Sequence, residues 1–397
     1  MASLELMEPA AAGLENTSVS AKRIVYLLPT SAPYHVAVLE RLYQCIGEGF
    51  LVLSHRRPRL EVSRIALHMG VFPRRILNGP SFTLSRFHDD GLQTPLGLSL
   101  PPSLPFVLAS LKPEVVIGTN FSIWTLVSVL MGYPTVVAWE GTHHTERTVS
   151  PWRMRLRRWI AARAKVFVVN GNLSRRYLMD AVGVPGDRIL EGGMCPGLPP
   201  ETARRGPRLP SPDEPITFLL VGRMILLKGV QHLLPALRLL RDRLGPEARF
   251  RLLLVGDGPE RGRFLQMTHD LQLQDKVSFV KSVPPHQVWD YYAKAHVFVL
   301  PTLQDNWPLV VPEAMSMGLP VLLSKYAGST PDLIREGENG YSFDPEDTPA
   351  LAGYMEQYVK NPELILKHGN RAREIASPYN PDRVAQVFLK AVDKANE

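Results

Sequence analysis

Two carboxylates stand on either side of a short proline-containing stretch of this 397-residue chain. In "QDNWPLVVPE", Asp305 lies eight positions before Glu313, with two prolines between them. The preceding run "HVFVLPT" (296–302) is typical of a buried strand, because it is short, apolar and rich in β-branched residues. Gly318 follows as a stop signal, so the spacing predicts a short helix over 309–317.

The start of such a helix suits an anionic ligand. Its first amides, at Leu309, Val310 and Val311, have no acceptor within the helix and lie at its positive end. Glu313, in the first turn, can accept hydrogen bonds from vicinal hydroxyls, as an acidic residue does for a nucleotide ribose. Asp305 comes before the helix, nearer to any group that extends beyond a diphosphate. An ordinary loop entering a helix, with both carboxylates solvated, is the alternative reading.

Two cations follow another apolar run. After "ITFLLVG" (216–222), the segment "RMILLKG" places Arg223 and Lys228 five positions apart. A planar guanidinium and a mobile ammonium together suit a diphosphate, although two side chains that simply reach water would show the same spacing. The next glycine-rich turn, "GDGPERG" (256–262), has neither the dinucleotide fingerprint nor the Lys-Ser or Lys-Thr of a P-loop. A nicotinamide dehydrogenase is therefore disfavoured.

Apolar runs alternate with helix-like stretches along the whole chain. Strands that are apolar on both faces belong to parallel sheets covered by helices, so the fold class is α/β with two parallel units. Ligands of such units lie at the carboxyl ends of the strands. The strands are predicted at 23–29, 50–54, 114–118, 135–139 and 165–169 in the first unit, and at 216–222, 249–256, 276–280, 296–301 and 320–324 in the second.

The proline- and glycine-rich stretch around residues 192–215 divides the two units. We predict five segments. They are a flexible N-terminal tail (1–22) without the basic and apolar pattern of a secretory signal, an N-terminal Rossmann-like domain (23–195), a linker (196–215), a C-terminal Rossmann-like domain (216–375) and a C-terminal helix (376–397) that packs back on the N-terminal domain.

Composition limits the class of protein. Two cysteines, Cys45 and Cys195, provide no disulfide framework, so a reducing, cytoplasmic setting is expected. The uncharged stretch 115–139 is long enough for a membrane span, but the turn residues at 132–134 split it into strand, helix and strand. A net charge of +7 and the basic run 151–165 indicate an acidic partner. Peripheral contact with anionic lipid stays open beside the favoured reading, a solvated helix packed by its tryptophans, and nothing indicates nucleic acid.

The ordered motifs of the second half resemble retaining glycosyltransferases of family 4, which have the GT-B fold of two Rossmann-like domains facing across a cleft. The resemblance runs through "VGRMILLKGVQHLLPAL", "LLLVGDGPERGRF", "DNWPLVVPEAMSMGLPVLLSKYAGSTPDLI" and "GENGYSFDPED", over about 130 residues. It is weaker in the first half, in "APYHVAVLERL", "WEGTHHTER" and "VNGNLSRRYLMDAVGVPGDRIL".

This resemblance implies a role for each site residue. Arg223 and Lys228 match the pair that binds the donor diphosphate. Asp305 and Glu313 fall on two family glutamates, the first near the donor sugar and the second at the ribose. One of two adjacent histidines should reach the sugar from the first domain; we prefer His144, with His143 as the alternative, and both could equally be loop residues satisfied locally.

Three departures from the family pattern are visible. Asp305 is shorter than the usual glutamate, and "PTSAPYH" (29–35) lacks the glycine pair that many members have there. Lys281 replaces a glycine of the base-binding turn, so the base is unassigned.

The resulting hypothesis is a retaining glycosyltransferase that moves a sugar from a UDP-sugar or GDP-sugar to a hydroxyl acceptor, in the cytoplasm or at the cytoplasmic face of the membrane. Neither a cofactor nor a metal is expected, and Asp89 with Asp90 is interpreted as a solvated pair. The acceptor is a lipid-linked saccharide, a glycan or a small metabolite. The alternatives are a nucleotide-sugar epimerase of GT-B architecture and a catalytically weak binding or partner subunit.

Overall fold

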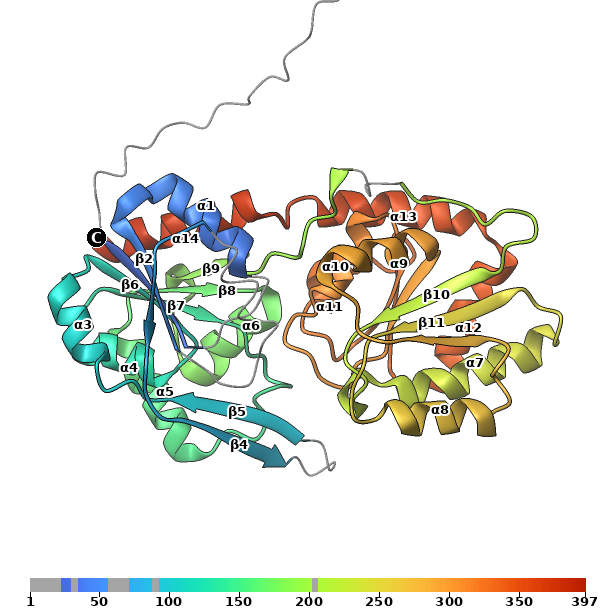
Figure 1. Cartoon of the computed structure of the whole chain (residues 1–397), viewed down its shortest axis with the longest axis horizontal. Coiled ribbons are helices and arrows are strands. Elements are labelled where there is room, and N and C mark those ends of the chain that lie inside the picture. Colours follow the sequence, from blue (N-terminus) through green and yellow to red (C-terminus); the bar gives the residue numbers. More distant parts are fainter. Residues whose placement is uncertain (1–22, 30–34, 56–70, 88–92, 202–205) are drawn as a thin grey trace, which may run out of the picture.

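The chain forms two α/β halves, each built around its own sheet (Figure 1). The structure is a computed structural model, and it describes residues 23–29, 35–55, 71–87, 93–201 and 206–397. The predicted tail (1–22), the pair Asp89 and Asp90, and most of the "PTSAPYH" loop lie outside these residues.

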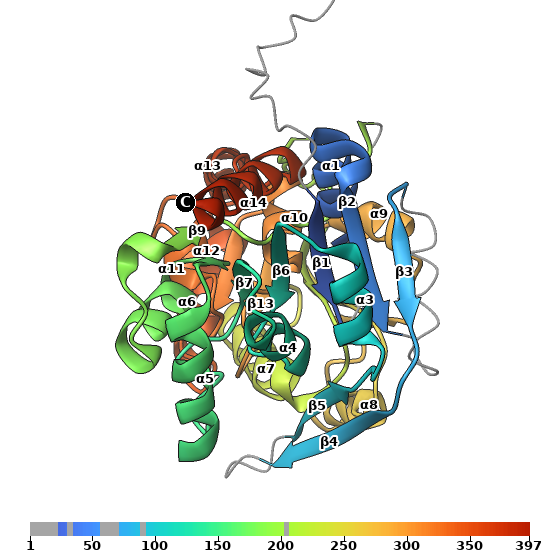
Figure 2. The same ribbon diagram turned by 90° about the vertical axis from the view of Figure 1, so that its left-hand side faces the viewer.

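The first sheet has seven parallel strands in the order β3-β2-β1-β6-β7-β8-β9. Helices α1 and α14 pack on one face, and α3, α4, α5 and α6 contribute to the cores of the other face. Figure 2 shows α3, α4, α5 and α6 in front of this sheet. The bounds are β1 Ile24–Leu28, β2 Phe50–His55, β3 Arg74–Leu77, β6 Val115–Thr119, β7 Thr135–Trp139, β8 Val166–Val169, β9 Ile189–Glu191, α1 His35–Ile46, α3 Leu104–Leu111, α4 Ile123–Leu130, α5 Pro151–Arg163, α6 Asn172–Tyr177 and α14 Pro381–Asn396.

The second sheet has six parallel strands in the order β12-β11-β10-β13-β14-β15. One continuous core joins this sheet to the helices that cover it, among them α7 and α8 on one side and α9, α10 and α13 on the other (Figure 1). The bounds are β10 Ile216–Val221, β11 Phe250–Val255, β12 Val277–Val280, β13 Val297–Leu300, β14 Val321–Ser324, β15 Gly340–Phe343, α7 Val230–Leu244, α8 Arg261–Asp270, α9 Val288–Lys294, α10 Val310–Ser316, α11 Thr330–Leu333, α12 Thr348–Lys360 and α13 Glu363–Ala376.

Both sheets are doubly wound. Strand order reverses direction between β1 and β6 in the first sheet and between β10 and β13 in the second. At such a switch point the loops that leave two neighbouring strands diverge to opposite faces, which opens a crevice at the carboxyl ends of the strands. The segments after β10 and β13 are therefore where a ligand of the second half is expected.

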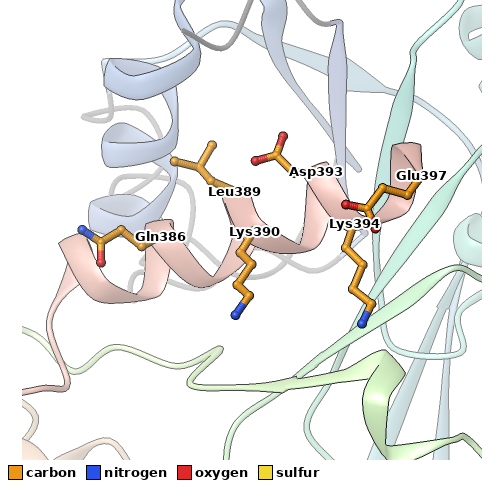
Figure 3. Close-up of a pocket in the computed structure, with 6 residues that line it drawn as sticks. All are labelled: Gln386, Leu389, Lys390, Asp393, Lys394 and Glu397. Carbon is orange, nitrogen blue, oxygen red and sulfur yellow. The ribbon is translucent and has the colours of Figure 1, made fainter. Parts of the chain in front are cut away.

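The last helix belongs to the first sheet. After α13, the chain crosses from the second half to the first, and α14 packs beside α1 over β6, β7 and β8 (Figure 1). The Phe388 ring lies 5.9 Å from the Tyr26 ring of β1. The outer side of α14 borders a shallow hollow lined by Gln386, Leu389, Lys390, Asp393, Lys394 and Glu397 (Figure 3). Five of these residues lie on α14, Glu397 directly follows it, and none follows a strand, so this hollow is not the expected ligand crevice.

The ten predicted strands are confirmed, with ends that differ by at most one residue. The uncharged stretch 115–139 is split into β6, α4 and β7, as predicted. In the described part of the chain, no helix has both the length and the apolar character needed to cross a bilayer. The analysis missed the short strands β3, β9 and β15, and also an antiparallel hairpin of β4 Ser81–Phe87 and β5 Gln93–Ser99.

The basic helix α5 packs differently from the expectation. Neither tryptophan of α5 belongs to a core: Trp152 is 65% exposed and Trp159 is only half-buried, whereas Ile160 and Ala161 are buried. Arg157 is buried as well, with its Nη2 2.7 Å from an oxygen of Glu146 and its guanidinium 4.9 Å from the Trp139 ring centre. The interpretation of α5 as a helix packed by its tryptophans is therefore wrong, because an arginine with a carboxylate partner takes that place.

Arg157→Met is expected to destabilise the first half by about 3 kcal/mol, since it leaves the Glu146 carboxylate without its partner in a poorly hydrated place. The midpoint of thermal unfolding measures this loss. Arg155→Met on the exposed side of α5 is the matched control, with an expected change within about 0.5 kcal/mol. Equal midpoints for the two variants would contradict a structural role of the Arg157 pair.

Candidate functional site

The loops that follow β10 and β13 touch each other at the switch point of the second sheet. Gly229 has a φ of +74°, and a Cβ atom there would lie 1.8 Å from the carbonyl oxygen of Pro301. The amide of Leu303 donates to the carbonyl of Leu227 at 2.8 Å. Only glycine permits both this backbone conformation and this approach. The contact fixes Lys228 beside the segment that carries Asp305.

Lys228 and Asp305 form an ion pair at this edge, with the ammonium nitrogen 2.5 Å from a carboxylate oxygen. Their side chains are only 20% and 17% exposed. An ammonium group has three N–H donors, so Lys228 can hold Asp305 and still donate to a phosphate. Arg223 begins the same loop and is exposed, with no ion pair to any described residue. Lys228 and Asp305 therefore meet at the switch point, and Arg223 lies exposed in the loop that leads to Lys228.

Helix α10 spans Val310–Ser316, close to the predicted 309–317. It begins after Leu309, and Pro312 lies in its first turn, where its missing N–H costs no helical bond. The amide of Val311 donates to the carbonyl of Pro308 at 3.1 Å. The expectation of a free Val311 amide is wrong, which leaves Leu309 and Val310 as the predicted anion donors.

Glu313 lies on α10 and points toward the linker between the two halves. Its carboxylate accepts a hydrogen bond from the Tyr292 hydroxyl at 3.0 Å and one from the Gly197 amide at 3.3 Å. Burial raises the pKa of this carboxyl group to about 7, against the opposing effect of these two hydrogen bonds. Its contact with a ribose stays a prediction.

The two adjacent histidines point to different places. The Nε2 atom of His144 lies 2.8 Å from the carbonyl oxygen of Leu303 in the second half, and its ring stacks on Tyr326 at 4.8 Å. His143 instead lies 3.5 Å from Asp180 of the first half. The geometry thus brings His144, rather than His143, to the segment that carries Asp305.

Further contacts hold the two halves together around this edge. Arg147 donates to the side chain of Gln304 at 2.6 Å. The Asp332 carboxylate accepts from the Asn172 amide at 3.2 Å, and burial raises the pKa of this carboxyl group. A Cβ atom on Gly328 would lie 3.2 Å from Thr142, so the loop after β7 is in close contact with the second half.

Sequence analysis missed one carboxylate of this site. Glu140 directly follows β7 and is partly buried. Burial, and secondarily the charge of Asp305 in the other half, raise the pKa of Glu140 to about 7. The position was visible in "WEGTHHTER", since it comes directly after the predicted strand "TVVAW".

The second half of the chain matches a known protein family. Residues 204–375 match the model of the family described as Glycosyl transferases group 1. The chain is 31% identical over 207 residues to a D-inositol 3-phosphate glycosyltransferase of Acidothermus cellulolyticus, which covers 49% of this chain and 45% of that protein. It is 24% identical over 345 residues to the sulfoquinovosyl transferase SQD2 of Arabidopsis thaliana, which covers 81% of this chain and 64% of that protein. The chain spans about half the length of the first two curated relatives that match it, 47% and 45%.

Solved structures show the fold. The Anabaena protein HepE in complex with UDP superposes with a TM-score of 0.74 at 16% identity, over 94% of this chain and 99% of that one. A sucrose-phosphate synthase of Thermosynechococcus elongatus superposes with a TM-score of 0.67 at 19% identity, over 93% of this chain and 98% of that one. The predicted resemblance to group 1 glycosyltransferases and the GT-B fold of two facing parallel α/β sheets are confirmed.

The raised pKa of Glu313 makes stability depend on pH. The folded protein holds this proton up to about pH 7, whereas the unfolded chain releases it near the ordinary glutamate pKa of 4.5. Its contribution is thus fully present below pH 4.5 and is lost as the pH rises through 7, by at most about 3 kcal/mol. The free energy of unfolding in urea should fall less across this pH range for Glu313→Gln than for the wild type. The exposed Glu363→Gln on α13 should leave the fall unchanged; identical curves for all three proteins would disprove the assignment.

Proposed function

We propose that this chain, whose residues 204–375 match glycosyl transferases group 1, is an enzyme that transfers a sugar from a nucleotide-diphosphate donor to a hydroxyl acceptor. The observation that carries the proposal is the Lys228–Asp305 pair at the carboxyl edge of β10 and β13, with His144 approaching from the first half and Arg223 exposed in the loop between β10 and Lys228. Cations suit a diphosphate, and a carboxylate beside them suits the hydroxyls of a sugar.

In the proposed reaction the departing diphosphate is stabilised by Arg223 and Lys228, with the amides of Leu309 and Val310 as further donors. The fixed cations take the role that a metal ion has in other phosphate sites, so none is proposed. Asp305 and His144 contact the transferred sugar. The bond between the anomeric carbon and the diphosphate oxygen breaks, and the anomeric carbon bonds to the oxygen of the acceptor hydroxyl with retained configuration. The proton of that hydroxyl passes to the departing diphosphate.

Glu313 is proposed to accept hydrogen bonds from the ribose. For this to happen, a hydroxyl must replace the Gly197 amide or share the carboxylate with it, because Tyr292 and Gly197 are the present partners of Glu313. The carboxylate has four lone-pair directions, of which these two contacts use only part.

A UDP-sugar or a GDP-sugar is the proposed donor, and the HepE structures in complex with UDP and with UDP-glucose support the first. The relatives include a D-inositol 3-phosphate glycosyltransferase and a sulfoquinovosyl transferase, so their names support a hydroxyl acceptor without choosing among a lipid-linked saccharide, a glycan and a small metabolite. The cytoplasm, or its membrane face, is the proposed location, supported by two free thiols.

Calorimetric titration with UDP, GDP and ADP, and with their common sugars, tests the donor cleft. One nucleotide diphosphate should bind tightly to the wild type, and Arg223→Ala should abolish the binding because it removes an oriented phosphate contact. Turnover of Arg223→Ala should fall by about two orders of magnitude or more. Arg371→Ala, an exposed arginine on α13, is the control that should bind like the wild type.

If a folded wild-type protein binds none of these nucleotides, the proposed donor site is wrong. If a nucleotide does bind, acceptor-dependent release of nucleoside diphosphate separates the three hypotheses. A transferase releases it only with an acceptor, an epimerase releases none at steady state, and a binding subunit turns nothing over.

Peripheral contact with anionic lipid is proposed through the exposed side of α5. Trp152 is 65% exposed and Arg155 is exposed, whereas Arg157 is buried and so cannot contact lipid. Trp152→Ala combined with Arg155→Gln should weaken binding to vesicles of anionic phospholipid at low salt by about tenfold, since one aromatic contact and one charge are lost. Arg371→Gln on the other half is the control. Undiminished vesicle binding of the double variant would refute this surface.

A further inference from the structure

Glu140 occupies a part of the site for which the proposed reaction has given no role. It follows β7, whose side chains alternate between the two faces of the first sheet. Val136 and Ala138 contribute to the core under α1 and α14, so the period of two places Glu140 on the same face. Tyr26 of β1 points into this core as well. The carboxylate therefore lies at the carboxyl edge of the sheet, near the switch point between β1 and β6.

Groups from β1, from α6, from the loop after β7 and from the second half lie around Glu140. Tyr26 lies on β1, and burial together with the Glu140 charge raises the pKa of its hydroxyl, which stays protonated. Asp305 of the second half lies across from the loop that Glu140 begins: the Asp305 carbonyl accepts from the Gly328 amide, and Gly328 is in close contact with Thr142 of that loop. Asp305 itself is paired with Lys228. Ser174 of α6 donates to the backbone carbonyl of Glu140, and His144 of the same loop is turned to Leu303 and Tyr326.

No cation among the described residues neutralises this carboxylate, and it makes no hydrogen bond or ion pair with any of them. The Lys228 ammonium is 2.5 Å from Asp305, so its charge is directed to the other carboxylate. Two acids thus face one space from opposite halves, and only one of them has a counter-ion. Two neighbouring carboxyl groups of this kind hold a proton on the group that lacks the counter-ion.

We propose that Glu140 contacts the donor sugar as a neutral carboxylic acid, donating a hydrogen bond to one hydroxyl while the Asp305 carboxylate accepts one from another. The inference rests on the proposed function, because it requires a nucleotide sugar at Lys228. Binding such a donor adds the negative charge of a diphosphate to the same space, which strengthens the hold of Glu140 on its proton. Its raised pKa, about 7 without ligand, agrees with this role.

The first consequence is that donor binding takes up a proton. At about pH 8, one unit above the pKa of Glu140, most of the free protein has lost this proton and the donor complex regains it. Calorimetric titration with UDP-glucose, or with GDP-mannose if the nucleotide panel selects GDP, in buffers of different ionisation enthalpy counts the protons. The expected uptake approaches about one proton per donor bound and disappears in Glu140→Gln.

The second consequence concerns transfer rates. The kcat/KM of the wild type should fall as the pH rises above about 7, because the ionised Glu140 cannot donate. Glu140→Ala should lower kcat/KM at pH 7 by about a hundredfold, the usual loss for one oriented donor. Glu140→Gln should lose far less, because its amide still donates, and its alkaline fall should be absent. Glu48 is exposed and lies just before the amino end of β2, at the edge of the sheet opposite the candidate site. Glu48→Gln is therefore the matched control for charge, and it should keep both the alkaline fall in kcat/KM and the proton uptake.

Three results would overturn the inference. Donor binding without proton uptake would refute it while the donor site stands. A Glu140→Gln variant as inactive as Glu140→Ala, with a wild-type rate that rises with pH, would make Glu140 a proton acceptor instead. Binding of no nucleotide sugar by the folded wild type would remove the proposed function and this inference together. Circular dichroism of both Glu140 variants shows whether each folds.

Discussion

The order of the strands in the second sheet is the constraint on which the candidate site depends. Because β10 and β13 are sequence-distant neighbours in a parallel sheet, their following loops leave from one edge and must share its space. Gly229 allows these loops to approach to backbone contact at Pro301. Lys228 and Asp305 are 77 residues apart in the chain and meet only because of this pairing. Their ion pair holds in place the carboxylate that the proposed reaction needs.

A second constraint is that the site is shared between two halves. The loop after β7 contacts the loop after β13 through His144 and Arg147. The Asp332 carboxylate of α11 accepts a hydrogen bond from the first backbone amide of α6. These are polar contacts around one edge rather than a continuous apolar interface, since the cores of the two halves are separate. Polar contacts of this kind exchange with water at small cost, which suits a crevice that must admit and release a charged ligand.

Sequence reasoning succeeded where hydrophobic periodicity and chain order were sufficient. The strands that are apolar on both faces were all found, and Lys228 and Asp305, from the loops after two of them, meet in the structure. It failed where tertiary context decides. The edge strands β3 and β9 are too short or too polar to stand out, and the burial of Arg157 depends on Glu146 and Tyr177, which no local pattern links to it. Glu140 was not predicted, although it directly follows a predicted strand and so satisfies the rule that selected Asp305.

The path of α14 has a consequence for how the molecule can be divided. The second half is one uninterrupted stretch of chain, but the first half is completed only by the last helix, whose Val384, Phe388 and Val392 fill its core. In topological terms the second half is an insertion within the first. A fragment that ends before α14 would leave apolar side chains of the first sheet uncovered. The first half therefore cannot be produced intact as one continuous fragment that excludes the second half. Two chain crossings also join the halves, and a body held at two points can turn about the line through them but cannot swivel freely. Opening of the crevice is thereby reduced to a hinge with a single axis.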